Sequence, residues 1–210
     1  MGTEERLMLD GEVRKLIDPA LDRIGARLAA AGVSANSVTV AGGGIGLLAA
    51  GAIAFQFYLV GLALLLASRL CDGLDGAIAR ATKPSDYGGY LDIVLDFVFY
   101  GAIPLGFIVA NPAANAVAGS VLIFSFYING STFLAFAILA ERHDMISNSR
   151  GDKSLYFTTG LAEGTETIAV FSAFCLFPGV FPILAYVFAA VCFYTALSRI
   201  VLAGRQFGRR

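Results

Sequence analysis

Six long apolar stretches alternate with short polar links along most of this 210-residue chain. They cover residues 38–56, 58–80, 88–110, 114–140, 161–177 and 181–203. A helix needs about 20 mainly apolar residues to cross the hydrocarbon core of a bilayer, and most of the stretches reach that length. The fifth is short, and the fourth is long enough to tilt. The pattern predicts an all-α integral membrane protein with six transmembrane helices.

The segment before the first stretch has a different pattern. Apolar side chains recur between Val13 and Leu28 at the i, i+3, i+4, i+7 spacing of one helix face, and charged side chains take the other face. An amphipathic helix lying in the membrane interface fits this pattern, and so does a helix packed on the protein's own cytoplasmic face. We therefore expect a cytoplasmic segment over 1–36, a six-helix transmembrane domain over 37–204 and a basic tail over 205–210.

Composition and charge support the membrane assignment. Hydrophobic residues make up 57% of the chain and charged residues 15%, against roughly a quarter in soluble domains. The net charge of −1 does not indicate nucleic-acid binding. All fifteen Lys and Arg lie in the N-terminal segment, the links after the second and fourth stretches, the tail, or the span ends beside them, whereas the other three links carry no charge. The positive-inside rule then predicts that both termini lie on the cytoplasmic side of the membrane.

Four aspartates stand in or beside the apolar stretches, at Asp72, Asp75, Asp92 and Asp96. The first two are three residues apart and the last two are four apart, so each pair shares one face of a helix. Carboxylates in hydrocarbon are costly and usually functional, and four of them together would repel. A hard divalent cation such as Mg²⁺, which prefers carboxylate and phosphate oxygens, would offset that repulsion. The sequence therefore predicts a metal site at the cytoplasmic ends of these helices.

Glycines and an arginine complete the arrangement: Asp72-x2-Asp75-Gly76-x2-Ala79-Arg80, seven residues, then Gly88-x3-Asp92-x3-Asp96. Glycine lets a bulky ligand approach the backbone closely. This spacing resembles the signature of the CDP-alcohol phosphatidyltransferase family, membrane enzymes of phospholipid synthesis. The chain also resembles a small bacterial branch of this family, in which the fifth stretch begins with a segment similar to GLAEGTET. The resemblance to that branch does not identify the acceptor alcohol.

The resemblance implies a set of roles. Two ions, Mg²⁺ or Mn²⁺, would be held by all four aspartates, and Asp96 would also be the general base that deprotonates an alcohol. The activated donor would be CDP-diacylglycerol, CMP would leave, and the protein would be a homodimer among membrane lipids. The positions matching the family's CDP contacts are Asn36, Thr39, Asp72, Gly76, Ala79, Arg80 and Ser85. Asn36 could instead simply cap a helix.

Two local patterns have their own interpretations. Gly42 and Gly46 have the small-xxx-small spacing that allows close helix packing, for which a phosphate-binding glycine loop is a weaker alternative. Glu163 and Glu166 stand one turn apart at the cytoplasmic end of the fifth stretch, where they could bind a small polar alcohol. Arg150 and Lys153 could instead bind a phosphorylated acceptor such as inositol phosphate or glycerol phosphate.

Two other classes of protein use similar residues. A transporter can line an ion path with intramembrane carboxylates, but here all sixteen Asp and Glu lie toward one side, so no path continues outward. A prenyl-diphosphate enzyme also binds metal through aspartates, but it leaves Gly76 and the Ala79-Arg80 pair without a role. The sequence therefore favours the phosphatidyl transfer enzyme.

Overall fold

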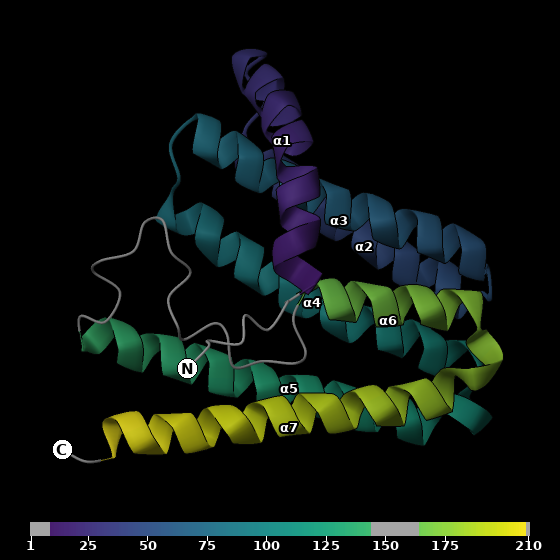
Figure 1. The fold of residues 1–210 in the computed structure, drawn as a ribbon. Coiled ribbons are helices and arrows are strands. Elements are labelled where there is room, and N and C mark those ends of the chain that lie inside the picture. Colours follow the sequence, from purple (N-terminus) through teal and green to yellow (C-terminus); the bar gives the residue numbers. More distant parts are fainter. Residues whose placement is uncertain (1–8, 144–163, 209–210) are drawn as a thin grey trace.

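The computed structural model describes residues 9–143 and 164–208, and this part of the chain is helical throughout apart from short links. Figure 1 shows the arrangement. In chain order the elements are α1 (Leu9–Ala30), α2 (Ala35–Ala54), α3 (Tyr58–Ala81), α4 (Asp86–Ala110), α5 (Pro112–Arg142), α6 (Gly164–Leu176), the 3₁₀ turn η1 (Pro178–Val180) and α7 (Phe181–Phe207). The all-α class expected from the sequence is confirmed.

Within residues 9–143 and 164–208, four segments are long and apolar enough to cross a membrane: α2, α4, α5 and η1 with α7. The second expected span, α3, has 24 residues, but it carries Arg69 at its middle and Asp72, Asp75 and Arg80 in its second half. The fifth, α6, has 13 residues and begins at the edge of the described part. Membrane insertion is thus supported, and six crossings remain a prediction.

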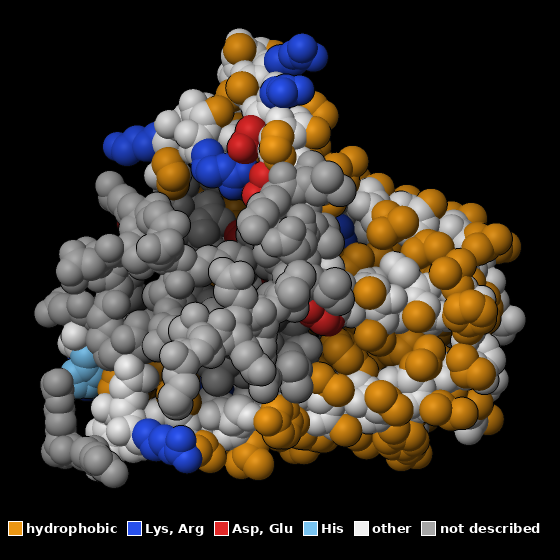
Figure 2. All heavy atoms as spheres, in the orientation of Figure 1, with side chains coloured by type: hydrophobic (Ala, Val, Ile, Leu, Met, Phe, Trp, Pro, Cys, Tyr) orange, Lys and Arg blue, Asp and Glu red, His pale blue; other side chains and the backbone are white. Residues whose placement is uncertain are grey.

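The helices pack both with neighbours in sequence and with the helix after the next one. α2 packs on α3 and α4, α4 also packs on α5, and α5 packs on α7, with α6 lying against α3 and α7. In Figure 1 the turn between α3 and α4 and the final residues of α5 and α7 lie at the left, while the three uncharged links lie at the right. Figure 2 shows hydrophobic side chains covering the right-hand part of this face, with the Lys and Arg mainly at the left and top. This polarity agrees with the charge pattern used to predict the topology.

Glycines let α2 approach its neighbours closely. A Cβ built on Gly42 would lie 2.9 Å from the Cβ of Cys71, and one built on Gly46 would lie 2.9 Å from the ring of Phe99 and 3.0 Å from Ser68 Oγ. Larger residues would therefore push α3 and α4 away from α2. The prediction of close packing at these two glycines is confirmed.

The expected N-terminal helix is present as α1, which continues through Pro19 and packs on α3 and α6. Leu21 is buried over Gly73, and Gly25 lies so close to α3 that a Cβ there would come within 2.6 Å of Ala77 Cβ. This half of α1 is therefore held against the helix that carries the first two aspartates. Its location at a membrane interface stays a prediction.

Candidate active site

The aspartates line a small cleft between α2, α3 and α4. The cleft brings together residues that are up to 57 positions apart in the sequence, because α3 and α4 both pack on α2 and are joined by a short polar turn. Its lining residues are Thr39, Gly42, Gly43, Ser68, Arg69, Asp72, Asp75, Asp92, Leu95 and Asp96.

Three of the aspartates form a group with metal-binding geometry. Asp72, Asp92 and Asp96 each offer one carboxylate oxygen, and the three atoms lie within 4.8 Å of one another. All three side chains are half-buried, so the oxygens face the cleft and can still be reached from outside. A set of carboxylate oxygens suits hard divalent cations such as Mg²⁺ and Mn²⁺. The cluster expected from the sequence is thus assembled by α3 and α4.

Asp75 lies deeper than the other three. Its side chain is buried at 7% exposure, and Oδ2 has no hydrogen-bond partner among the described residues. A buried carboxylate oxygen without a donor is costly, which makes it available to a cation in the same cleft. Asp75 therefore lines the same cleft, but its carboxylate oxygens are not part of the group formed by Asp72, Asp92 and Asp96.

A cation already sits among these acids. Arg69 Nη1 lies 2.6 Å from Asp96 Oδ1 and 3.6 Å from Asp72 Oδ1, and the arginine side chain is only 11% exposed. Its guanidinium carbon lies 3.8 Å above the centre of the buried Phe99 ring. No role was predicted for Arg69 from the sequence. Its spacing could have indicated one, because Arg69 stands one helical turn before Asp72.

Of the residues expected to bind the nucleotide, Thr39 and Asp72 line this cleft. Thr39 lines it from α2, and Asn36, one turn earlier, places Oδ1 2.9 Å from where a Cβ of Gly88 would be. Ser85 Oγ lies 3.1 Å from the same point and caps α4 by accepting from the Gly88 amide at 3.0 Å. Asn36 does not cap α2, since Ser34 accepts the hydrogen bond from the Ser37 amide instead.

Gly76, Ala79 and Arg80 follow on α3. Ala79 is half-buried, and a Cβ on Gly76 would meet only Arg80 Nη1, at 3.4 Å. The Arg80 guanidinium is exposed and donates to Asp22 of α1, with Nη2 2.7 Å from Oδ1. The described structure thus gives Arg80 an anionic partner from the packed N-terminal helix.

The acceptor residues are less completely described. Glu166 is half-buried near the start of α6, and its Oε2 is enclosed with no hydrogen-bond partner among the described residues. Glu163, Arg150 and Lys153 lie outside the described residues. Another cation, Arg199 of α7, donates to the carbonyl and side-chain oxygens of Asn129 on α5 at 3.0 and 2.9 Å.

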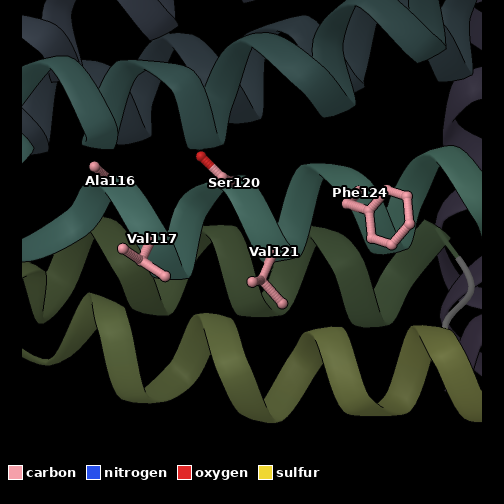
Figure 3. Close-up of a pocket in the computed structure, with 5 residues that line it drawn as sticks. All are labelled: Ala116, Val117, Ser120, Val121 and Phe124. Carbon is pink, nitrogen blue, oxygen red and sulfur yellow. The ribbon is translucent and has the colours of Figure 1, made fainter.

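A second, shallow hollow lies along α5 (Figure 3). Its lining residues are Ala116, Val117, Ser120, Val121 and Phe124. None of these five side chains is ionisable or a usual metal ligand, so the hollow offers no group for acid–base or metal chemistry. The acidic cleft is the better candidate for an active site.

Comparison with known proteins decides the family. Residues 32–197 match the family described as CDP-alcohol phosphatidyltransferase, and this range includes the complete aspartate motif. The chain belongs to the CDP-alcohol phosphatidyltransferase family. Membership excludes the transporter and the prenyl-diphosphate enzyme that were considered as alternatives. The chain is a membrane-embedded transferase of phospholipid synthesis.

Relatives within this family differ in how closely they match. The chain is 45% identical to the inner membrane protein YnjF of Escherichia coli K12, over 92% of this chain and 94% of YnjF. It is 33% identical to an archaetidylinositol phosphate synthase of Pyrococcus horikoshii, over 64% of this chain and 77% of that protein.

A solved structure shares the fold. The phosphatidylinositol phosphate synthase PgsA1 of Mycobacterium tuberculosis, solved with CDP-DAG bound, superposes with a TM-score of 0.64 at 21% identity, covering 88% of this chain and 93% of that one. The same protein has been solved with manganese and citrate, with a TM-score of 0.63, covering 86% and 87% of the two chains. At this level of identity the likeness concerns the fold.

Proposed function

We propose that this protein transfers a phosphatidyl group from CDP-diacylglycerol to the hydroxyl of a small polar alcohol and releases CMP. The observation that carries the proposal is the group of three carboxylate oxygens from Asp72, Asp92 and Asp96, within 4.8 Å of one another in a cleft beside the family's CDP motif. Support for the donor comes from the M. tuberculosis relative of the same fold, which binds CDP-DAG.

The metal would be held by these three aspartates with Asp75 below them. We propose two ions, Mg²⁺ or Mn²⁺, with Asp72 and Asp92 shared between them, as the family resemblance implies; the manganese complex of the M. tuberculosis protein supports a divalent ion. When bound, such ions neutralise the diphosphate and stabilise the departing oxygen.

The chain's own residues would perform the remaining steps. Asn36, Thr39 and Ser85 would hold the cytidine, and Arg80 would exchange Asp22 for a phosphate oxygen, with Gly76 leaving room and Ala79 beside it. Asp96 would accept the proton of the acceptor hydroxyl, whose oxygen then attacks the phosphorus on the lipid side. The bond from that phosphorus to the bridging oxygen breaks, and CMP leaves with the bonding electrons.

For the acceptor we propose an unphosphorylated alcohol that is neutral or cationic. Glu166 supports it, because an enclosed carboxylate oxygen without a donor is suited to accept a hydrogen bond from a hydroxyl. Glu163, one turn earlier in the sequence, would act with it. The same charges would repel a phosphate.

A phosphorylated acceptor is the second candidate, and one observation favours it. The Pyrococcus relative is named for the synthesis of an inositol phosphate lipid. Arg150 and Lys153 would then supply the positive charge. The two candidates rely on residues of opposite charge, so they can be separated by substitution.

The setting of the enzyme is part of the proposal. We infer six crossings, with α3 and α6 completing the four long apolar segments, and both termini and the acidic cleft on the cytoplasmic side of a bacterial inner membrane. The Lys and Arg of the described residues lie mainly at the left and top in Figure 2, away from the uncharged links at the right in Figure 1, which supports this orientation. A homodimer remains a prediction from the family.

The experiment is an acceptor panel. Purified protein in detergent or vesicles is given CDP-diacylglycerol, Mn²⁺ and, one at a time, glycerol, inositol, serine, ethanolamine, glycerol phosphate and inositol phosphate, and the lipid products are identified by mass spectrometry. A separate arm offers CDP-ethanolamine with diacylglycerol, to establish which partner carries the CDP group. We expect a product from an unphosphorylated alcohol; a product from inositol phosphate alone would establish the second candidate.

A further inference from the structure

Arg69 is the described cation closest to the carboxylate cluster. Its Nη1 is bonded to Asp96 Oδ1 at 2.6 Å and lies 3.6 Å from Asp72 Oδ1, so one guanidinium group faces two of the three proposed metal ligands. The two acids come from different helices, Asp72 from α3 and Asp96 from α4. Arg69 therefore joins α3 to α4 at the point where their negative charges meet.

Other contacts hold the guanidinium in place. It stacks on Phe99, and Nη2 donates to Ser68 Oγ at 3.3 Å. Ser68 is itself fully buried and donates to the Gly42 carbonyl at 2.8 Å, which ties it to α2. A guanidinium held on a ring face and a fixed hydroxyl loses little freedom when it binds a carboxylate. The arginine is thus built into the cleft and does not reach in from the surface.

The Arg69 guanidinium is also oriented toward the carboxylates. Arg69 Nε is buried without an acceptor among the described residues, although a buried donor normally finds one. The guanidinium is therefore oriented so that Nη1 meets Asp96, at the expense of an unpaired Nε. This is the arrangement expected if charge neutralisation of the cluster decides the side chain's position.

We propose that Arg69 is the internal counter-ion of the carboxylate cluster. It stabilises Asp72 and Asp96 close together when no metal is bound, and because its positive charge occupies the same oxygens it competes with divalent cations for them. Arg69 is a positioning residue in this account, and it lowers metal affinity while it stabilises the metal-free protein. The proposal rests on the metal site of the proposed function.

The alternative is that Arg69 only supports packing between α3 and α4 through Phe99 and Ser68. The two roles differ in their response to metal. If Arg69 only supports packing, its removal destabilises the protein equally with and without metal. If Arg69 is a counter-ion, its removal destabilises mainly the metal-free protein, because a bound divalent cation neutralises the carboxylates in its place.

The test measures stability and metal binding without any substrate. Arg69→Gln, Arg69→Lys and the parent protein are unfolded thermally in chelator and in saturating Mn²⁺, and Mn²⁺ affinity is measured by electron paramagnetic resonance. Arg199→Gln is the matched control, since it removes another half-buried arginine that lies over an aromatic ring but donates to the uncharged side chains of Asn129 and Thr132 on α5. Lysine keeps the charge at position 69 but cannot stack in the same way.

We expect Arg69→Gln to lower the Tm in chelator, to recover most of that loss in Mn²⁺, and to bind Mn²⁺ at least about tenfold more tightly than the parent. Arg69→Lys should remain near the parent in both measurements, and it carries the test if the glutamine variant does not fold. Equal Tm losses in both conditions, unchanged or weaker Mn²⁺ binding, or a lysine variant as defective as the glutamine one would each overturn the proposal. A parent protein that binds no Mn²⁺ would overturn the metal site itself, whereas the other results leave that site intact.

Discussion

Asp22 of α1 and Arg80 of α3 are paired across 58 positions of sequence, with Arg80 Nη2 2.7 Å from Asp22 Oδ1. Both side chains are more than half exposed, at 53% and 57%. Exposed ion pairs contribute at most about 1 kcal/mol, so a phosphate group can displace Asp22 easily. The pair therefore places the guanidinium near the nucleotide site without closing it.

The first prediction distinguishes donor binding by Arg80 from its ion pair with Asp22. Arg80→Ala should raise the KM for CDP-diacylglycerol roughly tenfold or more, because a hydrogen bond to a charged group contributes about 1.5–3 kcal/mol. Asp22→Asn breaks the same pair but keeps the cation, and should leave that KM within about fivefold of the parent. Steady-state CMP release against donor concentration measures both. Equal effects of the two substitutions would mean that α1 docking matters and that Arg80 does not contact the donor.

A second prediction uses two neighbouring glycines. Gly88→Ala places a Cβ 2.9 Å from Asn36 Oδ1 and 3.1 Å from Ser85 Oγ, so it should displace two proposed nucleotide contacts and lower kcat/KM for the donor about tenfold. Gly89→Ala is the control, since nothing lies within 4 Å of its Cβ. Both substitutions raise helix propensity similarly, so stability does not explain a difference. Similar activities for the two variants would contradict the placement of Asn36 and Ser85.

The acceptor site gives a third prediction. Glu166→Gln should raise the KM for an unphosphorylated acceptor roughly tenfold or more while the donor KM stays near normal, because a charged hydrogen-bond acceptor is lost from an enclosed site. Glu163→Gln should act in the same direction if the two glutamates bind the acceptor together. Arg150→Ala and Lys153→Ala should have little effect on that acceptor. The reverse pattern, with only the basic residues mattering, would favour inositol phosphate or glycerol phosphate.

The orientation in the membrane is tested by labelling. Single cysteines at Ala113, in the first turn of α5, or at Gly179, in η1, should react with an impermeant maleimide added outside intact cells. One at Thr82, between α3 and α4, should react only after permeabilisation. The parent chain is the control for background, since its Cys175 and Cys192 are buried and Cys71 is half-buried. Outside labelling at Thr82 would place the acidic cleft on the wrong face for a cytosolic nucleotide.

The helices and the aspartate cluster were predictable because each depends on a local pattern. Hydrophobic length locates the helices, and the fixed spacing of Asp72, Asp92 and Asp96 on two helix faces implies that they meet. The small glycines of α2 likewise indicated close packing, which the contact between Gly42 and Cys71 bears out.

The tertiary partners could not be predicted in this way. The pairs Arg69–Asp96 and Asp22–Arg80 join residues 27 and 58 positions apart, and their contact depends on how α1, α3 and α4 pack. The spacing of Arg69 from Asp72 shows that the two share a helix face, but it does not show that Asp96 of α4 lies within reach. The burial of Glu166 Oε2 depends on packing in the same way.

The central claim is that the carboxylate cleft catalyses metal-dependent phosphatidyl transfer, and CMP release measures it most directly. Purified protein with CDP-diacylglycerol, Mg²⁺ or Mn²⁺ and the accepted alcohol should release CMP, and excess chelator should abolish the release. Asp96→Asn should reduce turnover at least about a hundredfold while still binding the donor, and Asp72→Asn and Asp92→Asn should also weaken Mn²⁺ binding. Full CMP release in chelator, or an Asp96→Asn variant that turns over like the parent, would contradict the account.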